Sequence, residues 1–235
     1  MKYSKTRIIE TIKHPKRIFH YIIKERALKE ILPECNKADI KRYLQEAKNI
    51  GTELDNVITQ YKKYVYNLEV PFLETSIIYT CVRALKPQVV IETGVSNGIF
   101  THFILKALDK NGHGKLYSID IRMTSSAYPS GKKTGWLAPP ELRNRWEFLL
   151  GDSREILPIL LSKLQSIDIF IHDSDHTYDN MSFEFKTAWK KIKNGGILIS
   201  DDINSNNAFK DFISVNRKHI TKVVAFSKLG LIRKI

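Results

Sequence analysis

The stretch IHDSDHTYDN, residues 171–180, places two histidines and three aspartates directly after an apolar run. A second acidic pair, Asp201 and Asp202, ends the apolar stretch GGILISDD. If the two apolar runs are neighbouring parallel strands, Asp173 and this pair meet at one edge of the sheet. Carboxylates held so close repel one another unless a proton or a cation neutralises them, and oxygen ligands favour Mg²⁺, Ca²⁺ or Mn²⁺ over zinc. The pattern predicts a divalent-metal site, with Mg²⁺ first, formed by Asp173, Asp201 and Asp202; the alternative is a solvated loop.

His176, three residues beyond Asp173, is the candidate general base. An imidazole titrates near neutral pH and can take a proton from a hydroxyl group that a metal has made more acidic. Asp173 and Asp175 are further catalytic candidates, and Asp175 either shares the base role or polarises the histidine. Two other roles stay open for His176: a hydrogen bond to the Asp173 carboxylate, or direct ligation of the metal. We expect His172, on the opposite face of the strand, to be a packed structural residue.

The stretch VVIETGVSNGIF, residues 89–100, predicts a strand, a tight glycine turn and the start of a helix. Gly94 and Gly98 fit positions where a Cβ atom would block a positive φ angle or the close approach of a ligand. Asp120 ends the next expected strand, where a carboxylate can bind both hydroxyl groups of a ribose. Because free N–H groups at a helix start also favour anionic groups, we expect a nucleoside cofactor at this end of the sheet.

Short β-rich runs alternate with helical stretches from residue 88 onward. The expected strands are residues 89–92, 116–120, 147–150, 167–171 and 197–200. Hydrophobic strands separated by helices predict parallel pairing with helices on both faces of the sheet. The last two runs, residues 222–226 and 229–234, are joined by a turn too short for a helix and must pair antiparallel. The expected fold class is α/β, a Rossmann-like, doubly wound and mostly parallel seven-stranded sheet with a C-terminal antiparallel hairpin and additional N-terminal helices.

The N-terminal part of the chain is helical and basic in pattern. Residues 37–66 carry apolar side chains at helical spacing, and residues 73–85 predict a second helix that ends before Lys86-Pro87. Residues 1–48 hold thirteen Lys and Arg against six Asp and Glu, about half of the net charge of +13. We therefore expect a basic helical extension at residues 1–70, which could contact anionic lipid, nucleic acid or a neighbouring subunit of a homo-oligomer, and a sheet domain at residues 71–235.

Several classes of protein are disfavoured by composition. Cys35 and Cys81 have no partner at a motif spacing, which argues against a disulfide scaffold or a zinc cluster and for a cytoplasmic location. The sequence has neither the core of a signal peptide nor an apolar run long enough to cross a membrane. Helix-turn-helix, zinc-finger and RNP patterns are also missing, so nucleic acid is not the favoured partner.

Residues 121–146 lie between two expected strands but hold three prolines and two glycines. We interpret this stretch as an insertion at the strand ends, either a lid or binding loop or a plain surface loop. Tyr128 and Trp136 are its candidate contacts for the apolar face of a substrate.

The string Glu92-x-Gly94-x-x-x-Gly98 resembles motif I of the class I S-adenosylmethionine-dependent methyltransferases, with Ser96 where many members have glycine. The G-x-G-x-x-G spacing of nicotinamide enzymes is absent. The resemblance implies S-adenosylmethionine as cofactor and a class I methyltransferase domain at residues 71–235. The implied cofactor-binding residues are Glu92, Gly94, Ser96, Gly98, Asp120, Asp152 and Ser153. The acid of motif I approaches the amino group of the cofactor in that family, and Asp152 and Ser153 match the position that faces the adenine, although either could also cap a helix.

The motifs HDSDHTY and GGILISDD match a bacterial-type family of class I methyltransferases, and the chain resembles metal-dependent O-methyltransferases over roughly residues 72–235. That resemblance implies Asp173, Asp201 and Asp202 as metal ligands, and His176 stands where catechol-type members hold a lysine. The expected function is O-methylation of a small-molecule hydroxyl group, on a sugar or a catechol-like diol. The alternatives are a metal-independent methyltransferase acting on another nucleophile and a non-catalytic binding or scaffold protein with a relic cofactor fold; an NAD-dependent oxidoreductase is a more distant one.

Overall fold

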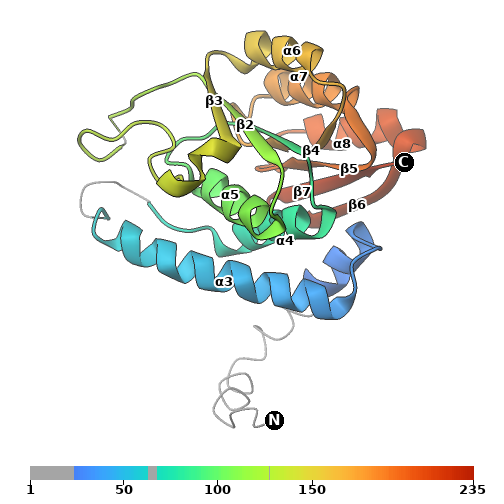
Figure 1. The fold of residues 1–235 in the computed structure, drawn as a ribbon. Coiled ribbons are helices and arrows are strands. Elements are labelled where there is room, and N and C mark those ends of the chain that lie inside the picture. The colour runs from blue at the N-terminus through green and yellow to red at the C-terminus, as the bar shows by residue number, and fades with distance from the viewer. Residues whose placement is uncertain (1–23, 63–67, 127) are drawn as a thin grey trace, which may run out of the picture.

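The computed structural model describes residues 24–62, 68–126 and 128–235, and it is built around one seven-stranded sheet (Figure 1). The strands follow the order β3-β2-β1-β4-β5-β7-β6 across the sheet. Their bounds are β1 Val89–Thr93, β2 Lys115–Asp120, β3 Trp146–Leu150, β4 Ile167–His172, β5 Ile192–Ser200, β6 Ile220–Phe226 and β7 Leu229–Lys234. The predicted fold class is therefore confirmed, and the main difference is that β5 begins five residues earlier than expected.

The pairing of the strands creates a crevice beside β1. Strands β1 to β5 pair in parallel, and β1 pairs with both β2 and β4. The chain therefore runs outward to β3 on one side of β1 and returns to β4 on the other side. Ligands bind outside the carboxyl ends of parallel strands at such a reversal. Strand β7 pairs antiparallel with both β5 and β6, as the short turn before it requires.

Helices cover both faces of the sheet (Figure 1). One face carries α3 Lys37–Thr59, α4 Phe72–Leu85 and α5 Ile99–Asn111, and the other carries α6 Ser153–Lys163, α7 Tyr178–Trp189 and α8 Ala208–Asn216. Strand β4 shows why both layers form: Ile169 and Ile171 join the first hydrophobic cluster, whereas Phe170 joins the second. Successive side chains of a strand point to opposite faces, so a strand with apolar side chains on both faces must be covered twice.

Helix α3 begins where the sequence predicts and ends earlier. The Asn36 side chain accepts a hydrogen bond from the backbone N–H of Asp39 (2.8 Å) and caps the helix, which ends at Thr59 rather than near residue 66. Its buried side chains, among them Leu44 and Ile58, belong to the same hydrophobic cluster as α4, α5 and one face of the sheet. The division at residue 70 stays a prediction, and most of the basic N-terminus, residues 1–23, lies outside the described residues, as do residues 63–67. Within the described ranges, no helix has the length and apolar character of a membrane span.

Candidate active site

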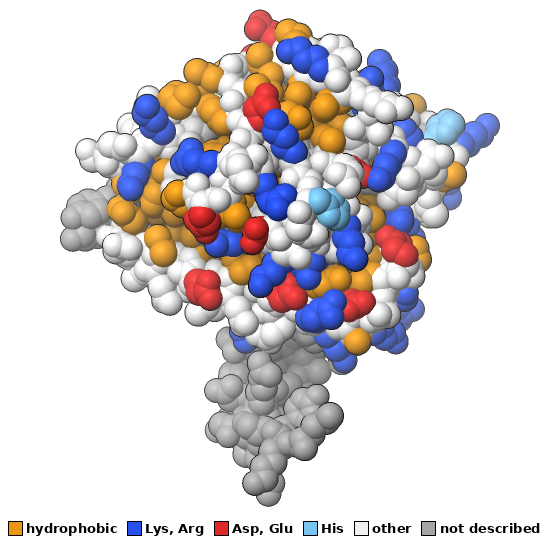
Figure 2. All heavy atoms as spheres, viewed as in Figure 1, with side chains coloured by type: hydrophobic (Ala, Val, Ile, Leu, Met, Phe, Trp, Pro, Cys, Tyr) orange, Lys and Arg blue, Asp and Glu red, His pale blue; other side chains and the backbone are white. Residues whose placement is uncertain are grey.

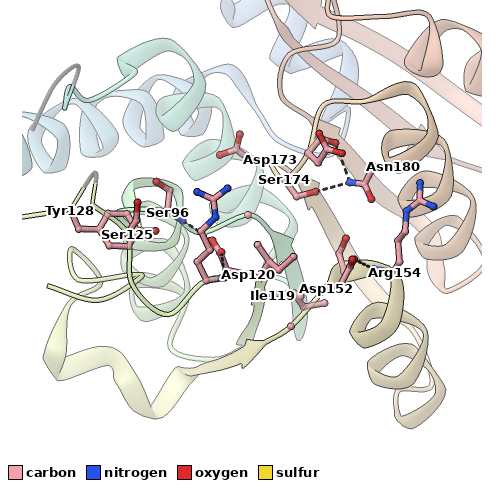
Figure 3. A pocket seen from close by; sticks show the side chains of 16 residues that line it. Ser96, Ile119, Asp120, Ser125, Tyr128, Asp152, Arg154, Asp173, Ser174 and Asn180 are labelled. Carbon is pink, nitrogen blue, oxygen red and sulfur yellow. Dashed lines mark hydrogen bonds between the residues drawn. The ribbon is translucent and has the colours of Figure 1, made fainter.

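A pocket of about 580 Å³ lies at the carboxyl ends of β1, β2, β3 and β4 (Figure 3). Five of the predicted cofactor-binding residues line it, namely Gly94, Ser96, Asp120, Asp152 and Ser153. Asp173, Ser174 and Asp175 form the wall that follows β4. The pocket therefore joins the predicted cofactor residues to the first residues of the predicted catalytic stretch.

Gly94 allows the ends of β1 and β4 to meet. Its φ is +81°, and a Cβ atom there would lie 1.9 Å from the backbone oxygen of Asp173. Gly94 donates its N–H to the Ile119 oxygen (2.8 Å), and Asp173 donates its N–H to the Thr93 oxygen (2.8 Å). A side chain at position 94 would push these strand ends apart, so only glycine fits.

Gly98 has the positive φ that the sequence predicts, and its close neighbour is a second glycine. It caps α5 with a φ of +88°, and a Cβ atom there would lie 2.8 Å from the Cα atom of Gly135. The residue is needed for the packing of the irregular connection that follows β2, and it is not among the residues that line the pocket. Ser96, where motif I often has glycine, adopts a φ of +48°.

Asp120 shapes the turn that follows β1. One of its carboxylate oxygens, Oδ2, accepts the backbone N–H groups of Val95 (2.8 Å) and Ser96 (3.0 Å), and the other accepts the N–H of Arg122 (2.9 Å). Since each carboxylate oxygen has two lone pairs, Oδ1 can still accept a hydroxyl group from the pocket. The side chain lies in the pocket wall, as Figure 3 shows.

Glu92 is fully buried beneath this turn and does not appear in the pocket wall. Its Oε2 accepts hydrogen bonds from the hydroxyl groups of Ser118 (2.6 Å) and Thr101 (2.8 Å), while its Oε1 is buried and has no hydrogen-bond partner in the described part of the chain. Burial raises the pKa of Glu92 to about 7, against the opposing effect of the two hydroxyl donors. Its predicted contact with the cofactor stays a prediction.

Asp152 has the capping role that was one of the two predictions for it, while the adenine contact of Asp152 and Ser153 stays a prediction. Asp152 is the N-cap of α6 and accepts the backbone N–H of Arg154 on Oδ1 (2.8 Å). Both residues also line the pocket, so a helix start faces its interior.

Three side chains beyond the ends of β4 and β5 form a group with the dimensions of a metal site. Asp173, His176 and Asp201 each offer a ligand atom, and these atoms lie within 4.8 Å of one another. Asp201 Oδ1 and His176 Nε2 are buried without a hydrogen-bond partner among the described residues. Buried polar atoms of this kind are costly unless a ligand, proton or ion satisfies them. Two carboxylates and one imidazole therefore fit a divalent cation.

The electrostatics of this group agree with that geometry. Burial, and then the neighbouring carboxylate of Asp201, raise the pKa of Asp173 well above its usual value. Burial, followed by the nearby imidazole of His172, lowers the pKa of His176. At neutral pH, His176 is thus a neutral imidazole with a lone pair that can take a proton or a metal.

Asp202, the third predicted metal ligand, lies beside the group. Its Oδ2 is 3.7 Å from Nδ1 of His176, the ring nitrogen opposite to the one that faces Asp173. Asp175, a predicted catalytic residue, lies in the pocket wall and accepts the hydroxyl group of Thr177 (2.8 Å). His176 therefore belongs to the donor group, Asp202 lies behind its imidazole, and Asp175 lies in the pocket wall.

Lys228 enters the site from the turn between β6 and β7, and the sequence reasoning missed it. Its Nζ lies 3.1 Å from Asp201 Oδ2 and 3.6 Å from Asp202 Oδ1. Partial burial disfavours the charged amine, but both carboxylates outweigh that effect and raise the pKa of Lys228. The sequence shows only a lysine in a short hairpin turn. The lysine can be assigned to the site once β7 is known to lie beside β5.

Glu184, in α7, is a second residue that the sequence reasoning missed. Its carboxylate is fully buried and accepts hydrogen bonds from Thr93 (2.6 Å) and Ser174 (2.7 Å), with His172 Nδ1 at 2.6 Å. Burial opposes ionisation, but the hydrogen bonds outweigh it and lower the pKa of Glu184. His172 is fully buried in this network, as expected for a structural residue.

Comparisons with known proteins agree with this geometry. Residues 91–203 match a family model described as a methyltransferase domain. A comparison with curated proteins gave no match. The match covers β1 to β5, including every strand end that contributes to the pocket.

Solved structures with this fold include several methyltransferases. The chain is similar to the MycE methyltransferase of the mycinamycin biosynthetic pathway, solved with Mg and SAH, at 16% identity and a TM-score of 0.54, over 77% of this chain and 54% of that one. It is also similar to the O-methyltransferase TomG from Streptomyces achromogenes (15%, TM-score 0.57, 79% and 89% of the two chains). An O-methyltransferase from Bacillus cereus, solved with SAH, gives 15% identity and a TM-score of 0.55 over 85% and 92% of the two chains.

The chain therefore spans about half of the length of MycE and most of the other two. Residues 91–203, just under half of the chain, match the methyltransferase-domain model, and the described sheet has the fold of these methyltransferases.

Proposed function

We propose that the protein transfers the methyl group of S-adenosylmethionine to a hydroxyl group of a small molecule, and that a divalent cation takes part. The observation that carries the proposal is the position of Asp173. This residue lines the 580 Å³ pocket and also belongs to the group formed with His176 and Asp201. Asp173 would therefore contact both a cofactor in the pocket and an ion bound by that group.

The cofactor would lie in the pocket with its parts at the strand ends. S-adenosylmethionine, when bound, supplies an electrophilic methyl group on a sulfonium centre. Asp120 would accept the ribose hydroxyl groups, and Asp152 and Ser153 would face the adenine. Gly94 would lie against the cofactor at the point where β1 and β4 meet, because it lines the pocket there. The polar lining of the pocket supports this arrangement.

Asp173 and Asp201 would hold the cation, with His176 Nε2 beside them and Asp202 behind the imidazole. The cation, when bound, supplies Lewis acidity that makes an acceptor hydroxyl group easier to deprotonate. The buried and unpaired Asp201 Oδ1 supports a bound ion. If the imidazole is itself a ligand, Mn²⁺ should be preferred over Mg²⁺, because nitrogen ligands suit the later metals better.

His176 is our proposed base because its lowered pKa leaves it neutral, with a lone pair available at neutral pH. It would accept the hydroxyl proton on Nε2, while Asp202 on the side of Nδ1 would stabilise the imidazolium that forms. The same position of Nε2 also supports the role of metal ligand, and metal affinity separates the two roles.

The similar structures support small-molecule O-methylation. MycE was solved with Mg, SAH and mycinamycin VI, and TomG is an O-methyltransferase of tomaymycin synthesis solved with SAM. We extend to this chain the class of acceptor, a small molecule with a hydroxyl group. The cytoplasmic location, which agrees with two buried free cysteines, Cys35 and Cys81, is also part of the proposal.

One observation favours the metal-independent alternative. The ammonium group of Lys228 already places one positive charge beside Asp201 and Asp202. A lysine could therefore neutralise part of the cluster without an ion.

A binding titration and then an activity assay test the proposed function. S-adenosylhomocysteine should bind with a dissociation constant in roughly the micromolar range, and a scaffold with a relic pocket should not bind it. Methyl transfer to a panel of sugars and catechols should then stop in EDTA and return with Mn²⁺ or Mg²⁺. Transfer that persists in EDTA would remove the cation from the proposal.

A further inference from the structure

A second pocket, of about 520 Å³, is lined by residues of the connection between β2 and β3 and by the side chains of Trp146 and Phe148 in β3. The residues that matter in its lining are three aromatic and three basic side chains, namely Trp136, Trp146, Phe148, Lys132, Lys133 and Arg143. None of the residues that line it belongs to the cofactor pocket. Figure 2 shows hydrophobic side chains beside Lys and Arg on the side of the molecule where Figure 1 draws β3 and this connection. We call the pocket lined by these six side chains the aromatic-basic pocket.

The aromatic walls of this pocket are held in place by the fold. Trp146 donates its Nε1–H to the Ser118 hydroxyl (2.9 Å), and Trp136 donates its Nε1–H to Asn97 Oδ1 (2.7 Å). Gly135 packs directly on the Trp146 ring, since a Cβ atom there would lie 2.3 Å from a ring atom. Rings that are fixed before a ligand arrives lose little entropy on binding.

All charged side chains that line the pocket are positive. Its lining holds no carboxylate, and within the described chain Lys132, Lys133 and Arg143 form no salt bridge. The nearest acids along the chain are engaged elsewhere: Glu141 with Lys106 (2.9 Å) and Glu147 with Lys115 (2.6 Å). Positive charges that lack acidic partners attract an anion.

Two of the cations lie over the ring faces. The Arg143 guanidinium is 5.5 Å from the centre of the Trp146 ring, and Lys132 Nζ is 5.4 Å from the centre of the Trp136 ring. A flat ring that stacks on either wall would have to move the cation off that ring face, and a charged substituent of the ligand could then pair with the displaced cation.

We propose that the aromatic-basic pocket is a second ligand site, which binds a flat aromatic ring that carries an anionic group. It is separate from the pocket where methyl transfer would occur, and its ligand need not be the methyl acceptor. The anionic group is a carboxylate or a phosphate, since a guanidinium and two ammonium groups can pair with either.

Isothermal titration of the full chain with 2-naphthoate, 2-naphthyl phosphate and neutral 2-naphthamide tests this site. The three probes share one ring, so the amide measures stacking alone and the two anions distinguish carboxylate from phosphate. Tryptophan fluorescence gives a second readout, because two of the three tryptophans of the chain line this pocket. Arg143→Gln removes a cation of the pocket, and Lys186→Gln is the matched control at an exposed position of α7.

At least one anionic probe should bind about tenfold more tightly than the amide, with quenching of tryptophan fluorescence. Arg143→Gln should weaken that binding about fivefold or more, at an unchanged melting temperature, whereas Lys186→Gln should not. Equal affinity for anion and amide, no binding of the anions up to millimolar concentration, or full affinity in Arg143→Gln would overturn the proposal. Binding of S-adenosylhomocysteine does not enter these outcomes, so they are independent of the proposed function.

Discussion

Asp173 Oδ1 lies 3.8 Å from Nε2 of His176, and the same aspartate forms part of the wall of the cofactor pocket. The end of β4 therefore serves two sites at once. Its backbone closes against Gly94 on the cofactor side, while its side chain faces His176 and Asp201. Changes at these strand ends should separate cofactor binding from cation binding.

Asp120→Asn should weaken the binding of S-adenosylhomocysteine about tenfold or more, because the amide replaces a carboxylate that accepts backbone N–H groups and would accept ribose hydroxyl groups. Calorimetric titration with S-adenosylhomocysteine measures the effect. The affinity for Mn²⁺ should stay unchanged. An unchanged affinity for S-adenosylhomocysteine would exclude Asp120 from the cofactor site.

Gly94→Ala should destabilise the fold by about 3 kcal/mol or more, since the new Cβ atom would overlap the Asp173 backbone in a conformation that alanine disfavours. Gly112→Ala is the matched control. Gly112 has a similar φ, +79°, but a Cβ atom there would meet nothing within 4 Å. The control should therefore lose only about 1–2 kcal/mol. Urea unfolding measures both free energies, and equal losses would mean that the strand ends do not approach as described.

Glu92→Gln should change how stability depends on pH. The folded-state pKa of Glu92 is raised to about 7 by burial, so the folded protein keeps a proton that the unfolded chain releases near its ordinary pKa. Stability is thus lost as pH rises from that ordinary value toward 7. This one group would lower the free energy of unfolding by about 3 kcal/mol between pH 4 and pH 8.

The glutamine variant lacks this loss, so it should gain stability relative to the wild type as the pH is raised. Urea unfolding at pH 5 and pH 8 measures the change, and Glu155→Gln, at an exposed position of α6, is the control. A difference between variant and wild type that is the same at both pH values would contradict the raised pKa.

His176→Ala distinguishes a base from a ligand. A ligand is lost with the side chain, so the affinity for Mn²⁺ should fall about tenfold or more if His176 binds the ion. If His176 is only the base, as we propose, Mn²⁺ affinity should stay within about threefold of the wild type and turnover with an identified acceptor should fall roughly a hundredfold or more. Calorimetry and the rate of methyl transfer measure the two effects. Full turnover across the pH range would exclude the base role.

The sheet was predictable from the sequence because each strand is a short apolar run that lies between helical patterns. The strand ends were predictable for the same reason. Asp120, Asp152 and Asp173, each at or after a predicted strand end, line one pocket as expected. Helix α3 was predicted too long, since the apolar spacing continues after Thr59 while the described chain turns at residues 60–62.

The missed residues depend on contacts between distant parts of the chain. Lys228 reaches Asp201 only because β7 inserts between β5 and β6, and nothing local to the hairpin turn reports that order. Glu184 lies on α7, and its buried partners come from β1 and from the residues that follow β4. The positive φ of Gly98 was predicted, but its contact with Gly135 was not, because Gly135 lies in an irregular connection.

The most direct measurement is the titration of Mn²⁺ into the chelator-treated protein saturated with S-adenosylhomocysteine, for the wild type, Asp201→Asn and the exposed control Asp179→Asn. The wild type and the control should bind one ion with a dissociation constant of roughly micromolar size, and Asp201→Asn should bind it about tenfold or more weakly. Absence of Mn²⁺ and Mg²⁺ binding in the wild type, or equal affinity in Asp201→Asn, would contradict a cation site formed by the ends of β4 and β5.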